Sequence, residues 1–138
     1  ILNGDTPNLT KELLFKFIQN HNNKILISEI DDPTGYGRII LNSQNNIVKI
    51  VEEKDANTQE RLVKLINSGI YFIESKNLIK YIPLIKNKNI QSEYYLTDII
   101  ELMILDNIDI KGHLINKDEN QLILGVNTAE QLHNLEKL

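Results

Sequence analysis

The chain has 138 residues, of which 41% are hydrophobic and 25% are charged, and its formal net charge is −4. This is the composition of an ordinary globular domain, and the acidic balance argues against a general attraction to nucleic acid or to membrane surfaces. The absence of cysteine excludes disulfides and thiolate metal sites and fits the reducing cytoplasm, and no apolar run approaches the ~20 residues of a membrane span.

Helices and strands are expected to alternate along the chain. Thr10, Ser75, Thr97 and Thr128 each precede an apolar pattern of helical period, where a hydroxyl can cap the first turn. Strands are expected over 24–30, 38–41, 47–53, 66–73 and 108–115, with a short helix or turn over 58–64. The alternation favours an α/β fold, and a hairpin turn at 45–46 favours a mixed sheet over a purely parallel one.

The loop between the first two expected strands gives the strongest local signal of a ligand site. Tyr36 lies between Gly35 and Gly37, shortly after Pro33. Glycine has no Cβ, so it lets the backbone approach a ligand closely. A plain connection could be shorter and less constrained, so the pattern favours a binding loop.

Two acidic residues are candidates for ligand contacts. Asp5 lies at an expected strand end, where ligands gather in open α/β sheets, and its carboxylate could hold Mg²⁺ beside phosphates; a turn before Pro7 is the alternative. Glu52 continues the strand face of Val48 and Ile50, where a carboxylate is costly unless it is paired. The alternative for Glu52 is a strand-end residue already in water.

Two further polar residues accompany them. Lys54 could be the ion-pair partner of Glu52 or a phosphate contact. Asn67 interrupts an apolar strand, which indicates either a bulge or a ligand contact.

Six short segments form an ordered set along nearly the whole chain. They are Asn3-Gly4-Asp5-Thr6-Pro7, Gly35-Tyr36-Gly37, the Val-Glu-Glu-Lys-Asp-Ala run of 51–56, the Ile-Asn-Ser-Gly-Ile run of 66–70, the Asn-Ile-Gln-Ser-Glu-Tyr-Tyr-Leu-Thr-Asp run of 89–98, and Gly125-Val126-Asn127 followed by Gln131-Leu132. In order and spacing the set resembles the uridylyltransferase domain of bacterial bifunctional N-acetylglucosamine-1-phosphate uridylyltransferase / glucosamine-1-phosphate acetyltransferases.

The resemblance implies a fold and a place within a longer protein. The fold would be a Rossmann-like mixed sheet of the nucleotide-diphospho-sugar transferase type, here as a partial domain. Residues 1–138 would be the C-terminal part of the uridylyltransferase domain, with the glycine-rich nucleotide loop upstream and the acetyltransferase domain downstream. We therefore expect the isolated chain to be inactive.

The resemblance also implies the activity of the intact protein. It would transfer a uridylyl group from UTP to N-acetylglucosamine 1-phosphate, giving UDP-N-acetylglucosamine and pyrophosphate for cell-wall precursor synthesis. Mg²⁺ would be the cofactor, and no side-chain nucleophile is implied. The protein would be cytoplasmic, without nucleic-acid or membrane partners, and a homotrimer through the domain that this chain lacks.

By resemblance, Asp5 and Asn127 are the metal ligands, although Asn127 alone could simply be a loop residue. The residues implied to bind substrates are Asn3, Gly4, Asp5, Gly37, Glu52, Asn67, Glu93, Tyr95, Thr97 and Asn127. For the three from the 89–98 segment, a plain helix entry capped by Thr97 is the alternative. Ile90 and Ser92 replace an alanine and a glycine of the family pattern. The resemblance therefore does not define the detailed shape of the pocket for the acetamido group of the sugar.

Two other functions remain open at this point. A nucleotidylyltransferase for another sugar 1-phosphate would share the role of Asp5 but not the Tyr-Tyr-Leu-Thr-Asp run of 94–98. A non-catalytic sugar-nucleotide-binding fragment is the second alternative.

Overall fold

The computed structural model describes residues 1–20, 23–126 and 133. Its elements are α1 (Lys11–Phe17), β1 (Lys24–Glu29), β2 (Arg38–Leu41), β3 (Ile47–Val51), α2 (Thr58–Arg61), β4 (Leu65–Phe72), α3 (Ser75–Tyr81), the 3₁₀ helix η1 (Ile82–Leu84), α4 (Asp98–Leu105), β5 (Lys111–Leu114) and the 3₁₀ helix η2 (Lys117–Leu122). No helix in this described part is long and apolar enough to cross a membrane. The helix expected after Thr128 lies outside the described residues.

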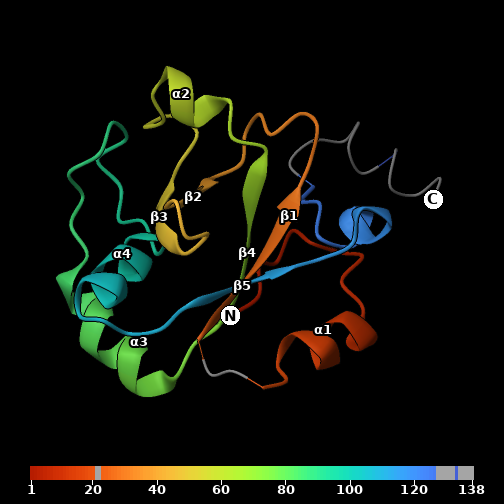
Figure 1. Ribbon diagram of the computed structural model, residues 1–138, viewed down its shortest axis with the longest axis horizontal. Helices are drawn as coiled ribbons and strands as arrows, with labels where there is room; N and C mark the ends of the chain where they lie inside the picture. Colours follow the sequence, from red (N-terminus) through yellow and green to blue (C-terminus); the bar gives the residue numbers. More distant parts are fainter. Residues whose placement is uncertain (21–22, 127–132, 134–138) are drawn as a thin grey trace.

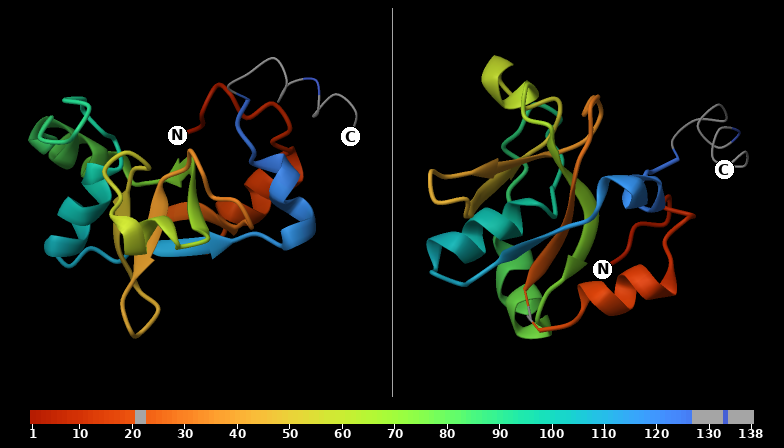
Figure 2. Two further views of the ribbon diagram at one scale, coloured as in Figure 1. Left: turned by 90° about the horizontal axis from the view of Figure 1, so that it is seen from above. Right: turned by 45° about the vertical axis from the view of Figure 1, so that its right-hand side comes forward.

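The strands form one five-stranded sheet in the order β3-β2-β4-β1-β5. β5 runs parallel to β1, and the other neighbours are antiparallel. The expectation of a mixed α/β sheet is therefore confirmed. Helices α3 and α4 cover one face of the sheet, while α1 and η2 lie on the other (Figures 1 and 2).

Alternation along the strands builds a separate core on each face. On β1, Ile25 and Ile27 pack in the cluster that contains Ile99 and Met103 of α4. Leu26, between them, packs with Leu13 and Phe17 of α1, Ile66 and Ile70 of β4, and Ile123. Because successive side chains of a strand point to opposite faces, three consecutive apolar residues can serve both cores.

The helix starts agree only in part with the predicted caps. The Thr10 hydroxyl accepts a hydrogen bond from Leu13 N at 3.2 Å, as expected. The prediction for Ser75 is wrong, because Ser75 is already helical and the cap position belongs to Glu74, whose side chain makes no capping bond. Thr97 does occupy the cap position of α4, but its hydroxyl also makes no capping bond.

Strand β3 ends at Val51 rather than at residue 53. Glu52 instead opens a turn in which its carbonyl accepts hydrogen bonds from Asp55 N and Ala56 N, each at 3.0 Å. The expected strand over 108–115 is also shorter, because only Lys111–Leu114 pairs with β1.

Strand β4 carries a bulge at its centre. The register with β1 passes from Ile25–Tyr71 to Ile27–Asn67, so three residues of β4 oppose Leu26 alone. Gly69 adopts φ +76°, a left-handed conformation that suits glycine. The Ser68 hydroxyl fastens the bulge by donating to the Leu26 carbonyl at 2.7 Å.

A buried ion pair joins β2 to the turn after β3. The Arg38 side chain is only 2% exposed, and its Nη2 lies 2.6 Å from Oε2 of Glu53. Arg61 of α2 binds Oε1 of the same carboxylate at 2.9 Å. Burial by itself raises the pKa of Glu53, but the hydrogen bond and charge of Arg38, with smaller contributions from Gly35 N–H and Arg61, lower it overall.

We expect Glu53→Ala to lower the free energy of unfolding of the chain by about 3 kcal/mol, because removing one partner of a buried pair leaves the other charge without compensation. Urea unfolding followed by circular dichroism measures the change. Asp31→Asn breaks the exposed pair with Lys64 and is the matched control, for which the midpoint should not move. Equal changes in the free energy of unfolding for the two substitutions would show that the Arg38–Glu53 pair contributes no more than a surface pair.

Candidate functional site

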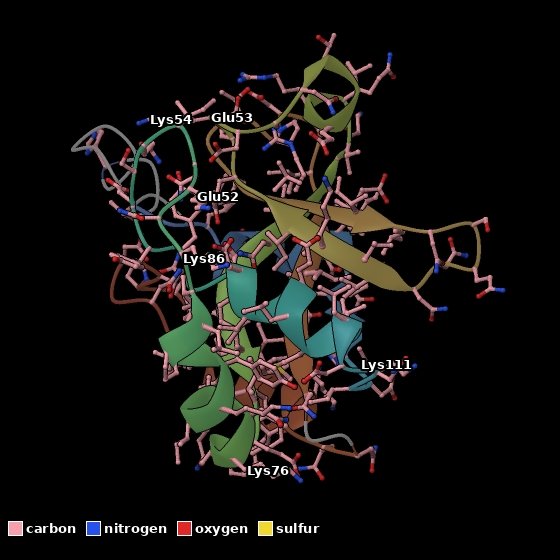
Figure 3. The ribbon with its side chains drawn as sticks, turned by 90° about the vertical axis from the view of Figure 1, so that its left-hand side faces the viewer. Glu52, Glu53, Lys54, Lys76, Lys86 and Lys111 are labelled. Atoms are coloured by element: carbon pink, nitrogen blue, oxygen red, sulfur yellow. The ribbon has the colours of Figure 1, made fainter. Side chains whose placement is uncertain are left out.

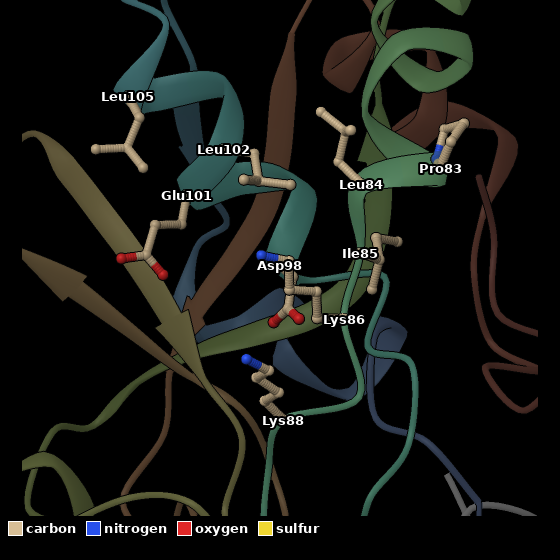
Figure 4. Close-up of a pocket in the computed structure, with 9 residues that line it drawn as sticks. All are labelled: Pro83, Leu84, Ile85, Lys86, Lys88, Asp98, Glu101, Leu102 and Leu105. Carbon is tan, nitrogen blue, oxygen red and sulfur yellow. The ribbon is translucent and has the colours of Figure 1, made fainter.

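Two hollows differ in what lines them. One, of about 660 Å³, lies between η1 and α4 (Figure 4) and is lined by Pro83, Leu84, Ile85, Lys86, Lys88, Asp98, Glu101, Leu102 and Leu105. None of the predicted site residues is among them. The other, of about 400 Å³, brings together seven of the predicted residues, and we call it the polar hollow: Asn3, Asp5, Gly37, Glu52, Asn67, Tyr95 and Thr97.

The polar hollow lies where two segments diverge along one edge of β4. At one end Arg38 pairs with Ile66, and Asn67 N donates to the Gly37 carbonyl at 2.8 Å. At the other end Ile1 exchanges backbone hydrogen bonds with Tyr71, at 2.8 and 3.1 Å. The bulged residues between them open onto the hollow. The hollow therefore lies beside the middle of β4, between its two backbone partners.

Asn3 fills the space beside the bulge. Its amide donates to the Ser68 carbonyl at 3.4 Å. A Cβ added at Gly69 would lie 2.0 Å from Asn3 Nδ2. The backbone conformation therefore favours glycine at position 69, and a larger residue there would also displace the Asn3 side chain.

In the part of the chain that the structure describes, Glu52 is one of two carboxylates that line the polar hollow, the other being Asp5. Oε1 of Glu52 accepts a hydrogen bond from the Thr97 hydroxyl at 2.9 Å, which explains why this hydroxyl does not cap α4. No donor among the described residues reaches Oε2, which lies close to Gly37: a Cβ added there would be 3.3 Å away. Burial raises the pKa of Glu52, with small contributions from Asp55 and Asp98, while the Thr97 hydrogen bond opposes the shift.

The sequence predicted either a bulge or a ligand contact at Asn67. In the structure Asn67 begins the bulge of β4 and also lines the polar hollow. Its Nδ2 donates to the Tyr71 hydroxyl at 2.7 Å, and its Oδ1 accepts from Gly69 N at 3.1 Å. Burial raises the pKa of Tyr71, so the phenol stays protonated at neutral pH and its hydroxyl hydrogen can be donated to a ligand.

The Gly35–Tyr36–Gly37 loop closes the hollow on the side of the N-terminal segment. Burial raises the pKa of Tyr36, whose hydroxyl makes a hydrogen bond with the backbone of Gly125. Val126 N donates to the Asp5 carbonyl at 2.8 Å, so the backbone of Val126 lies beside that of Asp5.

Residues 94–97 form the remaining wall of the polar hollow. The segment that leads to them passes beside the turn that carries Glu52, Glu53 and Lys54 (Figure 3). Lys54 does not pair with Glu52; its ammonium group donates to Oε1 of Gln91. Gln91 in turn donates to the Tyr95 hydroxyl at 2.7 Å. These contacts fix Tyr95 at the rim of the polar hollow.

Ser92, which replaces a glycine of the family pattern, has an unusual backbone conformation. Ser92 adopts φ +56°, the left-handed conformation that the family pattern assigns to glycine. The side chain of Asn89 holds this turn, since it accepts from Glu93 N at 3.1 Å and donates to the Glu93 carbonyl at 2.6 Å.

Two of the predicted residues that the structure describes do not line the hollow. Gly4 is exposed between two residues that do, and Glu93 is exposed in the Asn89 turn. Asn127 lies outside the described residues. Conversely, the sequence reasoning missed Tyr71 and Tyr94, both of which line the hollow. The pairing of Tyr71 with Asn67 depends on the bulge, because residues four apart in a regular strand share a face but lie about 13 Å apart.

Asp5 offers a carboxylate that could take part in holding a metal ion. It is exposed and lines the polar hollow, and its carboxylate has no hydrogen bond or ion pair within the described ranges. Those ranges contain no cluster of three or more histidine, aspartate or glutamate side chains able to hold a metal. The donor chemistry thus fits a hard cation that takes most of its ligands from phosphate oxygens and water, as Mg²⁺ does.

Comparison with known proteins places these features in context. No family model matches the chain. The bifunctional protein GlmU of Caldanaerobacter subterraneus subsp. tengcongensis is 46% identical over 144 residues, covering 100% of this chain and 31% of that protein. GlmU of Helicobacter pylori is 41% identical over 138 residues, with the same shares. The chain thus spans about a third of the length of these relatives, and the resemblance inferred from the motifs is confirmed.

A solved structure from Bacillus anthracis, named as a glucose-1-phosphate thymidylyltransferase and bound to a sucrose, shares the fold. Its TM-score is 0.54 at 20% identity, covering 89% of this chain and 52% of that one. The mixed sheet and its helices therefore share the fold of the matching part of that structure.

We expect Thr97→Val to raise the pKa of Glu52 further, because it removes the hydroxyl that favours the ionised carboxylate. Titration of the Glu52 side-chain carboxyl by ¹³C NMR measures the shift. Thr58→Val, an exposed threonine in α2, is the control and should leave the titration unchanged. If the pKa of Glu52 is the same in both variants, the hydrogen bond from Thr97 does not contribute to it.

Proposed function

From the homology of the whole chain to a segment of the bifunctional GlmU proteins, we propose that it is the C-terminal part of a uridylyltransferase domain. The longer protein would transfer a uridylyl group from UTP to N-acetylglucosamine 1-phosphate in cell-wall precursor synthesis. We infer that it works in the cytoplasm on these small molecules and assembles as a trimer through a domain outside this chain. The chain by itself would supply the sugar side of the site and would not catalyse transfer.

The observation that carries this proposal is the half-buried carboxylate of Glu52, with its Oε2 open to the polar hollow and its pKa raised by burial. A carboxylate kept at a cost in such a place suits a ligand rich in hydroxyl donors. Asn67 and Tyr71 add an amide and a phenol on the same wall. A sugar presents the matching mixture of donors and acceptors.

The proposed reaction needs positioning more than side-chain chemistry. A phosphate oxygen of the sugar phosphate would attack the α-phosphorus of UTP, forming the new P–O bond as the bond to pyrophosphate breaks. Asp5, together with Asn127 by resemblance, would hold Mg²⁺, which supplies neutralisation of phosphate charge when bound. Residues of the polar hollow would orient the sugar for this attack.

We expect Glu52→Gln to stabilise the folded chain at neutral pH and to weaken its function. Because burial raises the pKa of Glu52, its ionisation costs stability as the pH rises through that pKa, and the neutral amide removes the cost. Loss of a charged hydrogen-bond acceptor, about 1.5–3 kcal/mol, should raise the KM for N-acetylglucosamine 1-phosphate roughly tenfold to hundredfold. The KM for UTP should stay near that of the wild type.

Thermal melts of the chain and steady-state kinetics of the longer protein measure the two effects. Glu60→Gln, in the ion pair with Lys49 of β3, is the matched control. Equal changes in both KM values, or none, would remove Glu52 from the sugar site. Turnover with UTP and several sugar 1-phosphates, followed by pyrophosphate release, would separate the proposed substrate from another sugar phosphate.

We expect Asp5→Asn in the longer protein to lower kcat about 10²-fold, comparable to the loss of one preorganised electrostatic group. Folding should survive, because only the backbone carbonyl of Asp5 makes a structural hydrogen bond. Initial rates over a Mg²⁺ titration measure the effect. Unchanged rate and unchanged metal dependence would make Asp5 a turn residue.

A further inference from the structure

The carboxylate of Glu53 lies outside the polar hollow but holds the loop that forms one of its walls. Oε2 accepts hydrogen bonds from Arg38 Nη2 at 2.6 Å and from Gly35 N at 3.3 Å. Arg38 Nη1 donates to the Tyr36 carbonyl. Two consecutive residues of the loop are thus fixed through their backbones by one carboxylate, directly at Gly35 and through the guanidinium at Tyr36.

The same carboxylate also ties the loop to the turn that carries Glu52. Oε1 accepts from Arg61 Nη1 at 2.9 Å, and Arg61 Nε donates to the Ala56 carbonyl at 2.9 Å. Arg38 and Arg61 are the only arginines of the chain, and both bind Glu53. The guanidinium groups therefore link the loop, the turn and α2 at one point.

Gly35 is the residue of the loop with the fewest other contacts, since Gly37 is buried with its carbonyl bound by Asn67 N, and Tyr36 N donates to the Pro33 carbonyl at 3.1 Å. Gly35 is exposed, with φ +87° and nothing within 4 Å of an added Cβ. Gly37 must lie within contact distance of the Glu52 carboxylate for the hollow to have its shape. Without Glu53, Gly35 N–H and the Arg38 guanidinium lose their partner, and the exposed Gly35 gains access to other conformations.

We propose that Glu53 is a positioning residue that presets the Gly35–Tyr36–Gly37 loop for the ligand of the polar hollow. Its neighbour Glu52 touches that ligand and Glu53 does not. The identity of the ligand as a sugar phosphate rests on the proposed function, whereas the control of the loop by Glu53 does not.

The test compares Glu53→Gln with the matched Glu60→Gln in the 138-residue chain. Both convert a paired glutamate of the same region to an amide, but Glu60 binds Lys49 and the start of α2 rather than the loop. The readouts are the amide NMR signals of Gly35 and Gly37 and the affinity for N-acetylglucosamine 1-phosphate by calorimetry. We expect Glu53→Gln to shift both glycine signals and to weaken binding about tenfold, while Glu60→Gln does neither.

A second variant separates positioning from stability. In Arg38→Met/Glu53→Leu an apolar pair replaces the buried ion pair, an exchange that commonly restores stability. Restored thermal stability with binding still weak supports the proposal, because the loop backbone has lost its partners. Return of full binding with the apolar pair overturns it, as do unshifted glycine signals in Glu53→Gln. If the wild-type chain does not bind the sugar phosphate, the proposed sugar site fails, and the glycine signals alone decide the role of Glu53.

Discussion

The edge of β4 that faces β2 is the constraint around which the site is arranged. Backbone N–H and C=O groups in a sheet must find partners, and on this edge they find them in two unrelated segments, the start of β2 and the N-terminal residue. Between these two segments, no strand among the described residues pairs with the bulged residues of β4 on this side. The chain therefore leaves an opening in the middle of an otherwise well-packed sheet, and the polar residues of β4 face it.

Two adjacent glutamates in this arrangement have opposite environments. Burial raises the pKa of Glu52, whereas Arg38 and its companions lower that of Glu53 below the ordinary value despite the burial that opposes this. One carboxylate is left with an oxygen open to the polar hollow, and the other has both oxygens bound by guanidinium groups.

Local pattern was sufficient to predict the elements but not their side-chain partners. The periodicity located the strands and the hairpin, and the polar interruptions at Glu52 and Asn67 marked residues that do line the hollow. The failures share a cause, since a cap at Ser75 or a Glu52–Lys54 pair was inferred from neighbours in sequence. In the structure Lys54 binds Gln91 and Arg38 binds Glu53, contacts that depend on how distant turns come together. The role of Asn127 rests on resemblance alone.

The contact between Asn3 and Gly69 couples two distant positions of the chain. The Asn3 side chain thus lies where a side chain at position 69 would lie. We expect a larger residue at position 69 in related proteins to occur together with a smaller residue at position 3. A chain shortened by its first five residues would lose the Asn3 side chain as well as Asp5, and the floor of the hollow would then be exposed backbone.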